Sequence, residues 1–256
     1  MAWPLVTITS DLGHSDYYAA AFKGALLRSF PELKWMELAM DVTAFDPRHA
    51  AYVVRNAYPY FAPGTIHLIY MNPPEARGKM VVASHAGQYF VTFNTGLISL
   101  LFAEMPQEAY LVHDQIAASS NLFFVEGCTR VLAHLLEQKP LAEIGVKSPD
   151  IRRSILMQPM VQDGMIRGSV QYIDHYGNAI TNINRHMLQR AFADRRFVIS
   201  MNGGDAILSG DYSDVVPGEV VAFLNAEGFI EIAINKGSAF RLLGLRVDSQ
   251  ILVTAL

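Results

Sequence analysis

The stretch "LVTITSDLGHSDYYAAAFKGALLRS", residues 5–29, joins an apolar strand to a helix through a short polar turn. "LVTIT" has the length and β-branched content of a buried strand, and the apolar spacing predicts a helix over Ser15–Ser29 with Ser15 as its N-cap. The turn carries two carboxylates, Asp11 and Asp16, around Gly13. It has neither the glycine pattern of a dinucleotide site nor a phosphate-binding lysine. We therefore expect a strand–turn–helix unit whose ligand is not a phosphate.

The same alternation continues through the first part of the chain. Helical spacing in "PRHAAYVVRNAYPYF" (47–61) and "FVEGCTRVLAHLLEQ" (124–138) flanks a buried strand in "IHLIYM" (66–71). The segment "KMVVASHAGQYFVTF" (79–93) predicts a hairpin with "AGQ" at its turn. Strands that alternate with helices are typical of a largely parallel sheet, so we expect an α/β amino-terminal domain over residues 1–151.

The pattern of predicted secondary structure changes between Pro149 and Pro159. The segments that follow are short, β-branched and separated by Gly, Asn and Asp, and no long helix is predicted: "MIRGSVQYID" (165–174), "RRFVISMN" (195–202), "VVAFLN" (220–225), "FIEIAIN" (229–235), "FRLLGL" (240–245) and "QILVTA" (250–255). This spacing predicts an all-β, barrel-like carboxy-terminal domain over residues 158–256.

Bulk composition excludes several classes of protein. The chain has 256 residues, a net charge of −4 and one cysteine, which argues against a nucleic-acid partner and against a disulfide framework. The start "MAWPLVTITS" lacks the basic region of a signal peptide, and no uncharged run reaches the about 18 residues that span a bilayer. We expect a cytoplasmic protein without a membrane partner. The eight histidines show no metal-ligand spacing, so no metal is expected.

The two acids of the first turn have two interpretations. Asp11 follows a strand, and ligands of open α/β sheets bind beyond the carboxyl ends of the strands. A carboxylate there can accept hydrogen bonds from both hydroxyls of a ribose diol, or bind an ammonium or sulfonium cation. The alternative is that Asp11 or Asp16 caps the following helix.

Polar side chains also gather in two stretches of the second part. Asp174, Asn178 and Asn182 surround Gly177 in "YIDHYGNAITNIN" (172–184), which is either a polar hairpin loop or a set of paired donors and acceptors for a ligand. In "LNAEGFIEIAINKGSAFRLLGL" (224–245), asparagines lie at both ends of a predicted strand, and "KGSA" exposes backbone groups that could meet an adenine edge.

Three stretches together, in this order and spacing, resemble the superfamily of S-adenosyl-L-methionine hydrolases (hydroxide adenosyltransferases) and the related fluorinases and chlorinases. "TSDLGHSDYYAAAFKG" resembles the amino-terminal motif, "DHYGNAITNI" the carboxy-terminal-domain motif and "NAEGFIEIAINKGSA" the adenine-side motif. "FDPRHAAYVV" and "NTGLISLL" lie between them at family-like positions. The resemblance covers nearly the whole chain and implies an α/β domain, a β domain, and a homotrimer with sites between neighbouring subunits.

The resemblance also implies roles for residues of the first domain. Asp11 would bind the ribose diol, Asp16 would face the methionine end, and Phe45 would stack beside the nucleoside. Asn94, which begins "NTGLISLL", falls among the implied substrate-binding positions.

In the second domain, the implied substrate-binding positions are polar. Asp174 and Asn178 would bind the methionine ammonium and the adenine or carboxylate side, and the backbone around Lys236 would bind adenine. Asn225 and Asn235 complete this set.

The catalytic positions of the family are largely replaced. The hydrolases of the family share an Asp, an Arg and a His that position the attacking water. Here "NPPEARG" has Asn72 at the position of the acid and Arg77 as the arginine, and "NLFFVEG" has Phe123 at the position of the histidine. Glu75 or Glu126 could orient a water instead, or be surface and helix-start acids.

We interpret the chain as a binder of S-adenosylmethionine or a related adenosine compound, with hydrolysis to adenosine and methionine as its leading activity and no cofactor. Two alternatives are open. One is a catalytically silent relative that binds such a ligand as a sensor or assembly partner, which the replaced catalytic positions favour. The other is an enzyme acting on a different 5′-substituted adenosine.

Overall fold

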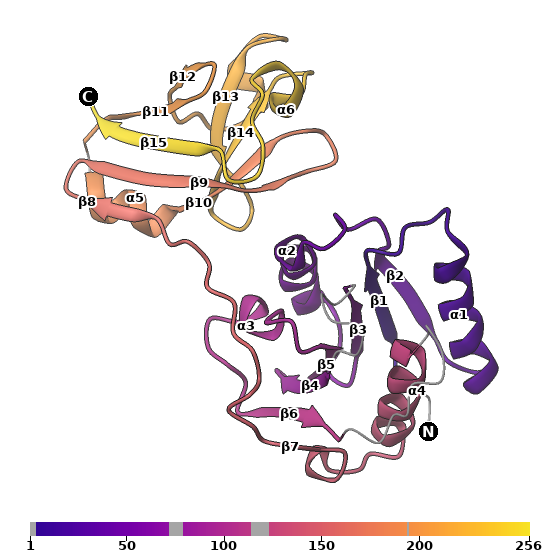
Figure 1. The fold of residues 1–256 in the computed structure, drawn as a ribbon. Coiled ribbons are helices and arrows are strands. Elements are labelled where there is room, and N and C mark those ends of the chain that lie inside the picture. The colour runs from indigo at the N-terminus through magenta and orange to yellow at the C-terminus, as the bar shows by residue number, and fades with distance from the viewer. Residues whose placement is uncertain (1–3, 72–78, 114–122, 194) are drawn as a thin grey trace. The chain divides into compact units, whose positions relative to one another are not determined.

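A computed structural model describes residues 4–71, 79–113, 123–193 and 195–256 of the chain (Figure 1). The chain divides into two compact units, Met1–Ile155 and Leu156–Leu256. The predicted fold class is confirmed, because the first unit is α/β and the second is built on antiparallel strands. The sheet of the first unit is mixed rather than largely parallel, since three of its six strand pairings are parallel and three are antiparallel. No helix within the described ranges is long and apolar enough to cross a membrane.

The sheet of the first unit has seven strands in the order β2-β1-β3-β5-β4-β6-β7. They are β1 (Val6–Ser10), β2 (Trp35–Ala39), β3 (Ile66–Tyr70), β4 (Met80–His85), β5 (Gln88–Phe93), β6 (Glu108–Val112) and β7 (Gly145–Val146). The first four in spatial order are parallel, and β4, β6 and β7 extend the sheet in antiparallel fashion. The predicted hairpin is β4–β5. Ala86 and Gly87 at its turn have φ of 50° and 74°, as a tight two-residue turn requires.

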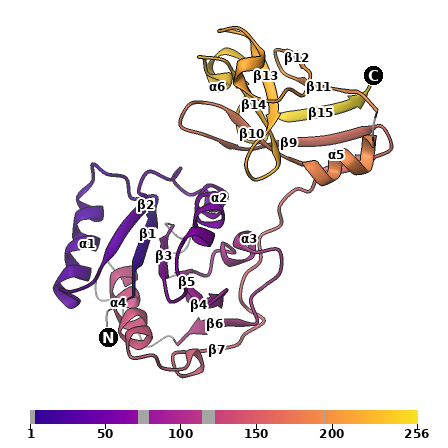
Figure 2. The same cartoon turned by 180° about the vertical axis from the view of Figure 1, so that it is seen from behind.

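Helices cover both faces of this sheet, as Figures 1 and 2 show. They are α1 (Tyr17–Ser29), α2 (Pro47–Ala57), α3 (Ile98–Leu101), α4 (Phe123–Leu136) and the 3-10 turns η1 (Tyr58–Tyr60) and η2 (Leu141–Glu143). On one face α1 and α4 meet, with the rings of Phe22 and Phe124 5.7 Å apart. On the other face the ring of Tyr58 packs against Phe90 and Phe102. Both faces are therefore closed, and the strand ends are the edges left for a ligand.

The second unit is a nearly closed antiparallel sheet. Its strands are β8 (Met160–Gln162), β9 (Met165–Ile173), β10 (Ala179–Asn184), β11 (Phe197–Met201), β12 (Gly204–Ala206), β13 (Val220–Leu224), β14 (Phe229–Ile234) and β15 (Gln250–Ala255). The order is β12-β11-β15-β9-β10-β14-β13, and β8 pairs with β9. A bridge between Leu208 and Ala222 joins the segment after β12 to β13, so the two edges of the sheet approach each other. The predicted barrel-like architecture is confirmed.

Two local predictions for the second unit are wrong. The helix α5 (Arg185–Phe192) forms where no helix was expected, because Asn184 caps it and Leu188 and Phe192 bury their side chains in the core. The expected strand "FRLLGL" is instead the short helix α6 (Ala239–Leu242), which Ser238 caps. The 3-10 turn η3 (Tyr212–Asp214) is likewise started by a capping residue, Asp211. In each case the capping side chain accepts a hydrogen bond from a backbone N–H at the start of the helical turn.

Candidate functional site

The carboxyl ends of β1 and β3 mark the point at which the order of the parallel strands reverses. From β1 the chain crosses through α1 to β2 on one side, and then through α2 to β3 on the other side of β1. The ligand crevice of an open α/β sheet lies at such a point. Asp11 follows β1 directly, and its backbone N–H donates to the carbonyl of Tyr70 at the end of β3 (3.3 Å). The topology therefore places Asp11 at the edge where a ligand is expected.

Asp11 also binds the loop that precedes α2. Its Oδ2 accepts a hydrogen bond from the backbone N–H of Phe45 at 3.2 Å. Phe45 has a φ of 63°, in the left-handed region that costs a bulky residue on the order of 1–3 kcal/mol. The residue is 70% exposed. A carboxylate beside an outward aromatic ring is an arrangement that can bind hydroxyl donors and stack a flat ring at the same time.

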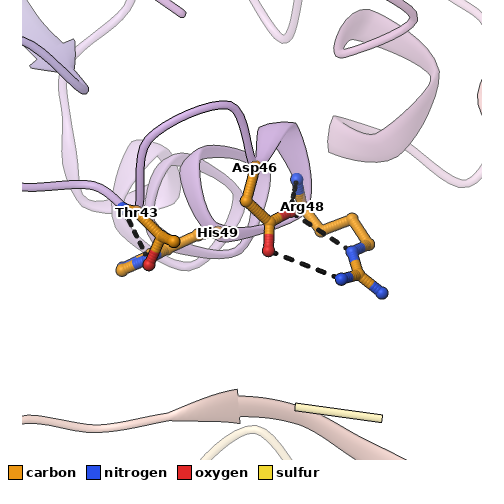
Figure 3. A network of polar contacts seen from close by, with 4 residues as sticks. All are labelled: Thr43, Asp46, Arg48 and His49. Atoms are coloured by element: carbon orange, nitrogen blue, oxygen red, sulfur yellow. Dashed lines mark hydrogen bonds and ion pairs between the residues drawn. The ribbon is translucent and has the colours of Figure 1, made fainter.

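Side-chain contacts fix both ends of the loop that carries Phe45 (Figure 3). At one end, the backbone N–H and the hydroxyl of Thr43 lie 3.1 and 2.9 Å from Nδ1 of His49. Because Nδ1 accepts the backbone N–H, the imidazole is neutral and carries its proton on Nε2. Burial lowers the pKa of His49, which favours this neutral form. At the other end, Asp46 caps α2 by accepting from the N–H of Arg48 (3.0 Å) and pairs with its guanidinium.

Asp16 is the N-cap of α1. Its Oδ1 accepts a hydrogen bond from the backbone N–H of Tyr18 at 3.4 Å. The expected cap at Ser15 is therefore wrong by one residue, and the capping interpretation holds for Asp16. The rings of Tyr17 and Tyr18 lie 4.1 Å apart at the start of the same helix. The role of Asp16 at the methionine end stays a prediction.

Tyr70 is a residue of this edge that the sequence reasoning missed. Its ring packs against Phe124 and Phe93, with centroid distances of 4.7 and 5.9 Å. Burial raises the pKa of Tyr70, and the negative charge of Asp11 raises it further. The phenol is therefore a neutral hydroxyl close to that carboxylate. Its place near the end of the apolar segment "IHLIYM" was the signal that could have identified it, and the structure pairs it in register with Ser10.

Asn94 lies just after β5 and binds the segment that leads out of the first unit. Its Nδ2 donates to the carbonyl of Asp150 (2.9 Å), and its Oδ1 accepts from the N–H of Arg152 (2.7 Å). Both ends of the amide are thus engaged with backbone. The structure does not join Asn94 to the Asp11–Phe45 pair.

The side chains of the three catalytic positions implied by the resemblance lie outside the described part of the chain. Asn72 and Arg77 lie outside the described residues. Phe123 begins α4, and its side chain likewise lies outside the described part of the chain. Their roles stay predictions.

In the second unit, a tight hairpin loop joins β9 to β10. Asp174 Oδ1 accepts from the backbone N–H of Asn178 (2.8 Å), and the N–H of Gly177 donates to the carbonyl of Asp174 (3.0 Å). Gly177 has a φ of 85°, and a Cβ on it would lie 2.0 Å from Ser238 Oγ. The carbonyl of Gly177 accepts from the N–H of Phe240 (2.9 Å). The polar hairpin interpretation is confirmed, and the loop is packed against the "KGSA" segment.

The side chains of this loop join a cluster on β14 and η3. Asn178 Nδ2 lies 3.0 Å from Asp174 Oδ2, 2.9 Å from the Tyr212 hydroxyl and 3.1 Å from Glu231 Oε1. The Tyr212 hydroxyl donates to Glu231 Oε1 at 2.7 Å. Burial raises the pKa of Glu231, as it does that of Tyr212. The sequence reasoning did not single out Glu231 or Tyr212, although a lone acid among the isoleucines of β14 was a usable signal.

The remaining predicted residues of the second unit have different surroundings. Asn225 closes the β13–β14 hairpin by accepting from the N–H of Phe229 (3.0 Å), and its side chain lies near enough to Glu231 to lower the pKa of that carboxyl group. Asn235 donates from Nδ2 to the carbonyl of Val215 (2.7 Å) and so holds a neighbouring loop. Lys236 is exposed in a left-handed turn with a φ of 54°. The structure thus joins Asp174, Asn178 and Asn225, with Asn235 and Lys236 at the following turn.

A metal site is not evident in the described part of the chain. No three His, Cys, Asp or Glu side chains there are placed to hold a metal ion.

Fold and site define a protein of two units. The first is an α/β unit with an acidic residue, Asp11, at the switch point, which is the place between β1 and β3 where the order of the parallel strands reverses. The second is a β unit that carries a cluster of amide and acid groups. Residues 6–145 match the model of the SAM hydroxide adenosyltransferase N-terminal domain, and residues 168–252 match that of the C-terminal domain. The chain belongs to the SAM hydroxide adenosyltransferase family.

Individual relatives match nearly the whole chain. An (R)-S-adenosyl-L-methionine hydrolase from Thermus thermophilus is 26% identical over 94% of this chain and 96% of its own length. One from Salinispora tropica is 27% identical over 98% of both, and a fluorinase from an Actinoplanes species is 24% identical over 98% and 97%. The crystal structure of an uncharacterized conserved protein from Thermotoga maritima has the same fold, with a TM-score of 0.84 at 23% identity over 97% of this chain and 99% of that one.

Proposed function

We propose that this chain binds S-adenosylmethionine, or a closely related 5′-substituted adenosine, and hydrolyses it to adenosine and methionine. Support comes from the family match over both units and from relatives named as hydrolases of this substrate. The observation that carries the proposal is the Asp11 carboxylate at the switch point, bonded to the backbone of an outward Phe45.

The proposed ligand fits the charge and geometry of this edge. A ribose offers two neighbouring hydroxyl donors, and a carboxylate can accept from both while Asp11 Oδ2 also accepts from Phe45. The exposed ring of Phe45 gives the nucleoside an apolar surface to stack on. The sulfonium and ammonium charges of S-adenosylmethionine are positive, which suits a site lined by acids.

The proposed reaction is a displacement at C5′ of the ribose. The oxygen of a water molecule forms a bond to C5′, and the bond between C5′ and the sulfonium sulfur breaks. The sulfur keeps the electron pair and leaves as the neutral thioether of methionine, and the water gives up one proton to solvent. Because the leaving group is neutral and already good, alignment and exclusion of bulk water can supply most of the acceleration.

We propose that this reaction is slow in the natural sequence. General-base assistance typically contributes about 10² to 10⁴-fold, and Asn72 and Phe123 stand where the resemblance implies an acid and a histidine. The same two residues favour a second candidate, a silent relative that binds the nucleoside without turning it over. The two candidates share the ligand and differ only in the chemistry.

One experiment separates the candidates. Purified protein is incubated with S-adenosylmethionine, and adenosine is followed by chromatography, with Asp11→Asn as the matched inactive control. Adenosine release that Asp11→Asn abolishes supports the hydrolase, whereas calorimetric binding without release supports the silent binder. A protein that does not bind S-adenosylmethionine and does not release adenosine from it would refute both candidates.

We further propose a homotrimer without nucleic-acid partner or cofactor. This assembly is what the resemblance implies, and light scattering tests it. We expect a trimer whose nucleoside binding weakens on dilution below the assembly threshold; a monomer that binds nucleoside normally would contradict this.

A further inference from the structure

The Asn178 amide is surrounded by acceptors on its nitrogen side. The residue is 4% exposed, and Nδ2 faces Asp174 Oδ2, the Tyr212 hydroxyl and Glu231 Oε1 within 3.1 Å. An amide nitrogen has two N–H donors, so it satisfies these three oxygens by sharing one of its hydrogens. The contacts come from three separate segments: the β9–β10 loop, η3 and β14.

The chemistry of these neighbours permits only one orientation of the amide. Reversing it would point the carbonyl oxygen of Asn178 at two carboxylate oxygens, an arrangement without any hydrogen between them. Tyr212 cannot compensate, because its own proton is donated to Glu231 at 2.7 Å. Glu231 Oε1 therefore accepts from both neighbours and fixes which end of Asn178 points away from it.

This orientation decides what Asn178 can offer a ligand. Both of its N–H groups are engaged, and within the described residues Oδ1 accepts no hydrogen bond. The amide therefore presents an acceptor, close to the Asp174 carboxylate, which is also an acceptor. Such a pair suits an ammonium or amino N–H donor and disfavours a carboxylate.

Burying the carboxyl group of Glu231 on β14 costs free energy. It is 8% exposed, and its neighbours Ile230 and Ile232 on β14 are fully buried. Burial raises the pKa of Glu231, and the charge of Asp174 raises it further, while hydrogen bonds from Tyr212, Asn225 and Asn178 oppose the shift. Burying a carboxyl group costs free energy unless hydrogen bonds compensate it, and an apolar side chain would satisfy the strand equally well.

We propose that Glu231 is a positioning residue of the nucleoside site: with Tyr212 it holds the Asn178 amide so that Oδ1, beside the Asp174 carboxylate, is the atom offered to a nitrogen donor of the ligand. The inference rests on the proposed function. It assigns Glu231 no contact with the reacting atoms.

The test measures S-adenosylmethionine affinity by calorimetry on the full chain. We expect Glu231→Leu to weaken binding about tenfold, because Asn178 loses the acceptor that orients it. Glu231→Gln can still accept both hydrogen bonds on its carbonyl and should stay within about threefold. Glu108→Leu is the matched control, since Glu108 accepts from the Tyr110 hydroxyl at 2.6 Å on β6 of the other unit, and it should leave the affinity unchanged.

A double-mutant cycle separates positioning from a merely structural role. If Glu231 acts through Asn178, then Glu231→Leu should change the affinity less than twofold in an Asn178→Ala background. Tyr212→Phe removes one hydroxyl from a residue that is 39% exposed, and it should weaken binding about threefold even if Glu231→Leu fails to fold.

Several results would overturn the inference. An equal loss in both backgrounds would mean that Glu231 acts by another route, and a Glu231→Gln variant as weak as Glu231→Leu would exclude the acceptor role. A folded Glu231→Leu or Tyr212→Phe variant with full affinity would do the same while leaving the proposed function intact. Wild-type protein that binds neither S-adenosylmethionine nor adenosine would instead refute the proposed function itself, before any variant is compared.

Discussion

The two polar clusters of the molecule hold their central side chains by opposite means. In the first unit, the Asp11 carboxylate binds the backbone of an exposed loop and keeps Phe45 in a left-handed conformation. In the second unit, the Asn178 amide is buried and is oriented by the side chains of Asp174, Tyr212 and Glu231. In the first cluster, the side chain of Asp11 holds the backbone of a loop. In the second cluster, other side chains hold the side chain of Asn178.

This difference predicts how each cluster responds to substitution. Substituting Asp11 removes a hydrogen-bond acceptor for the ligand and, at the same time, the anchor of the Phe45 loop. The loss of ligand affinity should therefore be large, and the two contributions should not be separable. Substitutions in the second cluster should act in graded fashion, because each hydrogen bond of a shared network contributes only about 0.5–3 kcal/mol.

The largest effect is expected at Asp11. Asp11→Ala should weaken adenosine binding about a thousandfold, because two charge-assisted hydrogen bonds to the ribose diol disappear together. The wild type should also bind adenosine far more tightly than 2′-deoxyadenosine, which lacks one of the hydroxyls. Calorimetry measures both. The control is Asp41→Asn, an exposed acid after β2, which should bind as the wild type does. Equal wild-type affinity for the two nucleosides would refute the diol assignment.

The next effect concerns the catalytic positions, which belong to neither cluster. Asn72→Asp combined with Phe123→His, with Arg77 kept, should raise the rate of adenosine release about a hundredfold, because an acceptor and an orienting group for water return. Each single change should do much less, since residues that act as a unit are strongly non-additive.

Chromatography at saturating S-adenosylmethionine follows all four proteins. Brisk wild-type turnover that Glu75→Gln or Glu126→Gln destroys would show that another acid has replaced the missing one. A double variant that binds tightly but stays inert would mean that the pocket itself has diverged.

A smaller effect is expected in the loop of the second cluster. Gly177→Ala should lower the free energy of unfolding by about 2 kcal/mol, because the added Cβ strains a left-handed φ and lies 2.0 Å from Ser238 Oγ. Gly228→Ala has a similar φ of 79° with nothing within 4 Å of the added Cβ, so it should cost about 1 kcal/mol. Urea unfolding compares them. Equal costs would show that Ser238 moves aside and that the loop is less rigid than its packing indicates.

The smallest effect is a pH dependence in the first unit. His67 is fully buried, with Nδ1 2.7 Å from the Thr7 hydroxyl and Nε2 2.7 Å from Gln88 Oε1. Burial lowers the pKa of His67 below its ordinary value of 6.5. The unfolded chain therefore takes up a proton at a higher pH than the folded chain. The resulting stabilisation is complete above about pH 7 and is lost as the pH falls through 6.5 towards the folded pKa.

Urea unfolding at about pH 7.5 and about pH 5.5 measures this slope. His67→Gln should flatten it, although it also lowers the stability at both pH values, and His49 keeps a residual slope of the same sign. His186→Gln, at an exposed residue of α5, should leave the slope unchanged. A slope that survives His67→Gln in full would mean that other groups cause it.

Sequence patterns predicted the fold wherever the local signal and the packing agree. The strand–turn–helix at residues 5–29 and the hairpin at 79–93 formed as expected, because apolar periodicity and turn residues there favour the same structure. The predictions failed where a cap decided the outcome. Asp16 took the place of Ser15, Asn184 started an unexpected helix, and Ser238 turned an expected strand into α6. A capping bond depends on a backbone geometry that residue types alone do not specify.

The sequence by itself determined the fold class and most of the polar residues around which the two clusters form. Asp11, Asp174 and Asn178 could be identified because acids and amides that directly border strands are conspicuous in an apolar chain. The family resemblance, carried by motifs spread over nearly the whole chain, named Phe45 as well.

Only the tertiary structure decided which atoms of these residues meet. It joined Asp11 to Phe45, 34 positions away, and it brought Glu231 and Tyr212 onto the amide of Asn178. It also engaged both ends of Asn94 with backbone, away from the pair at the switch point. The physical reason is that hydrogen bonds form over about 3 Å with defined directions, and such contacts depend on the crossing of strands and on loop conformation rather than on spacing along the chain.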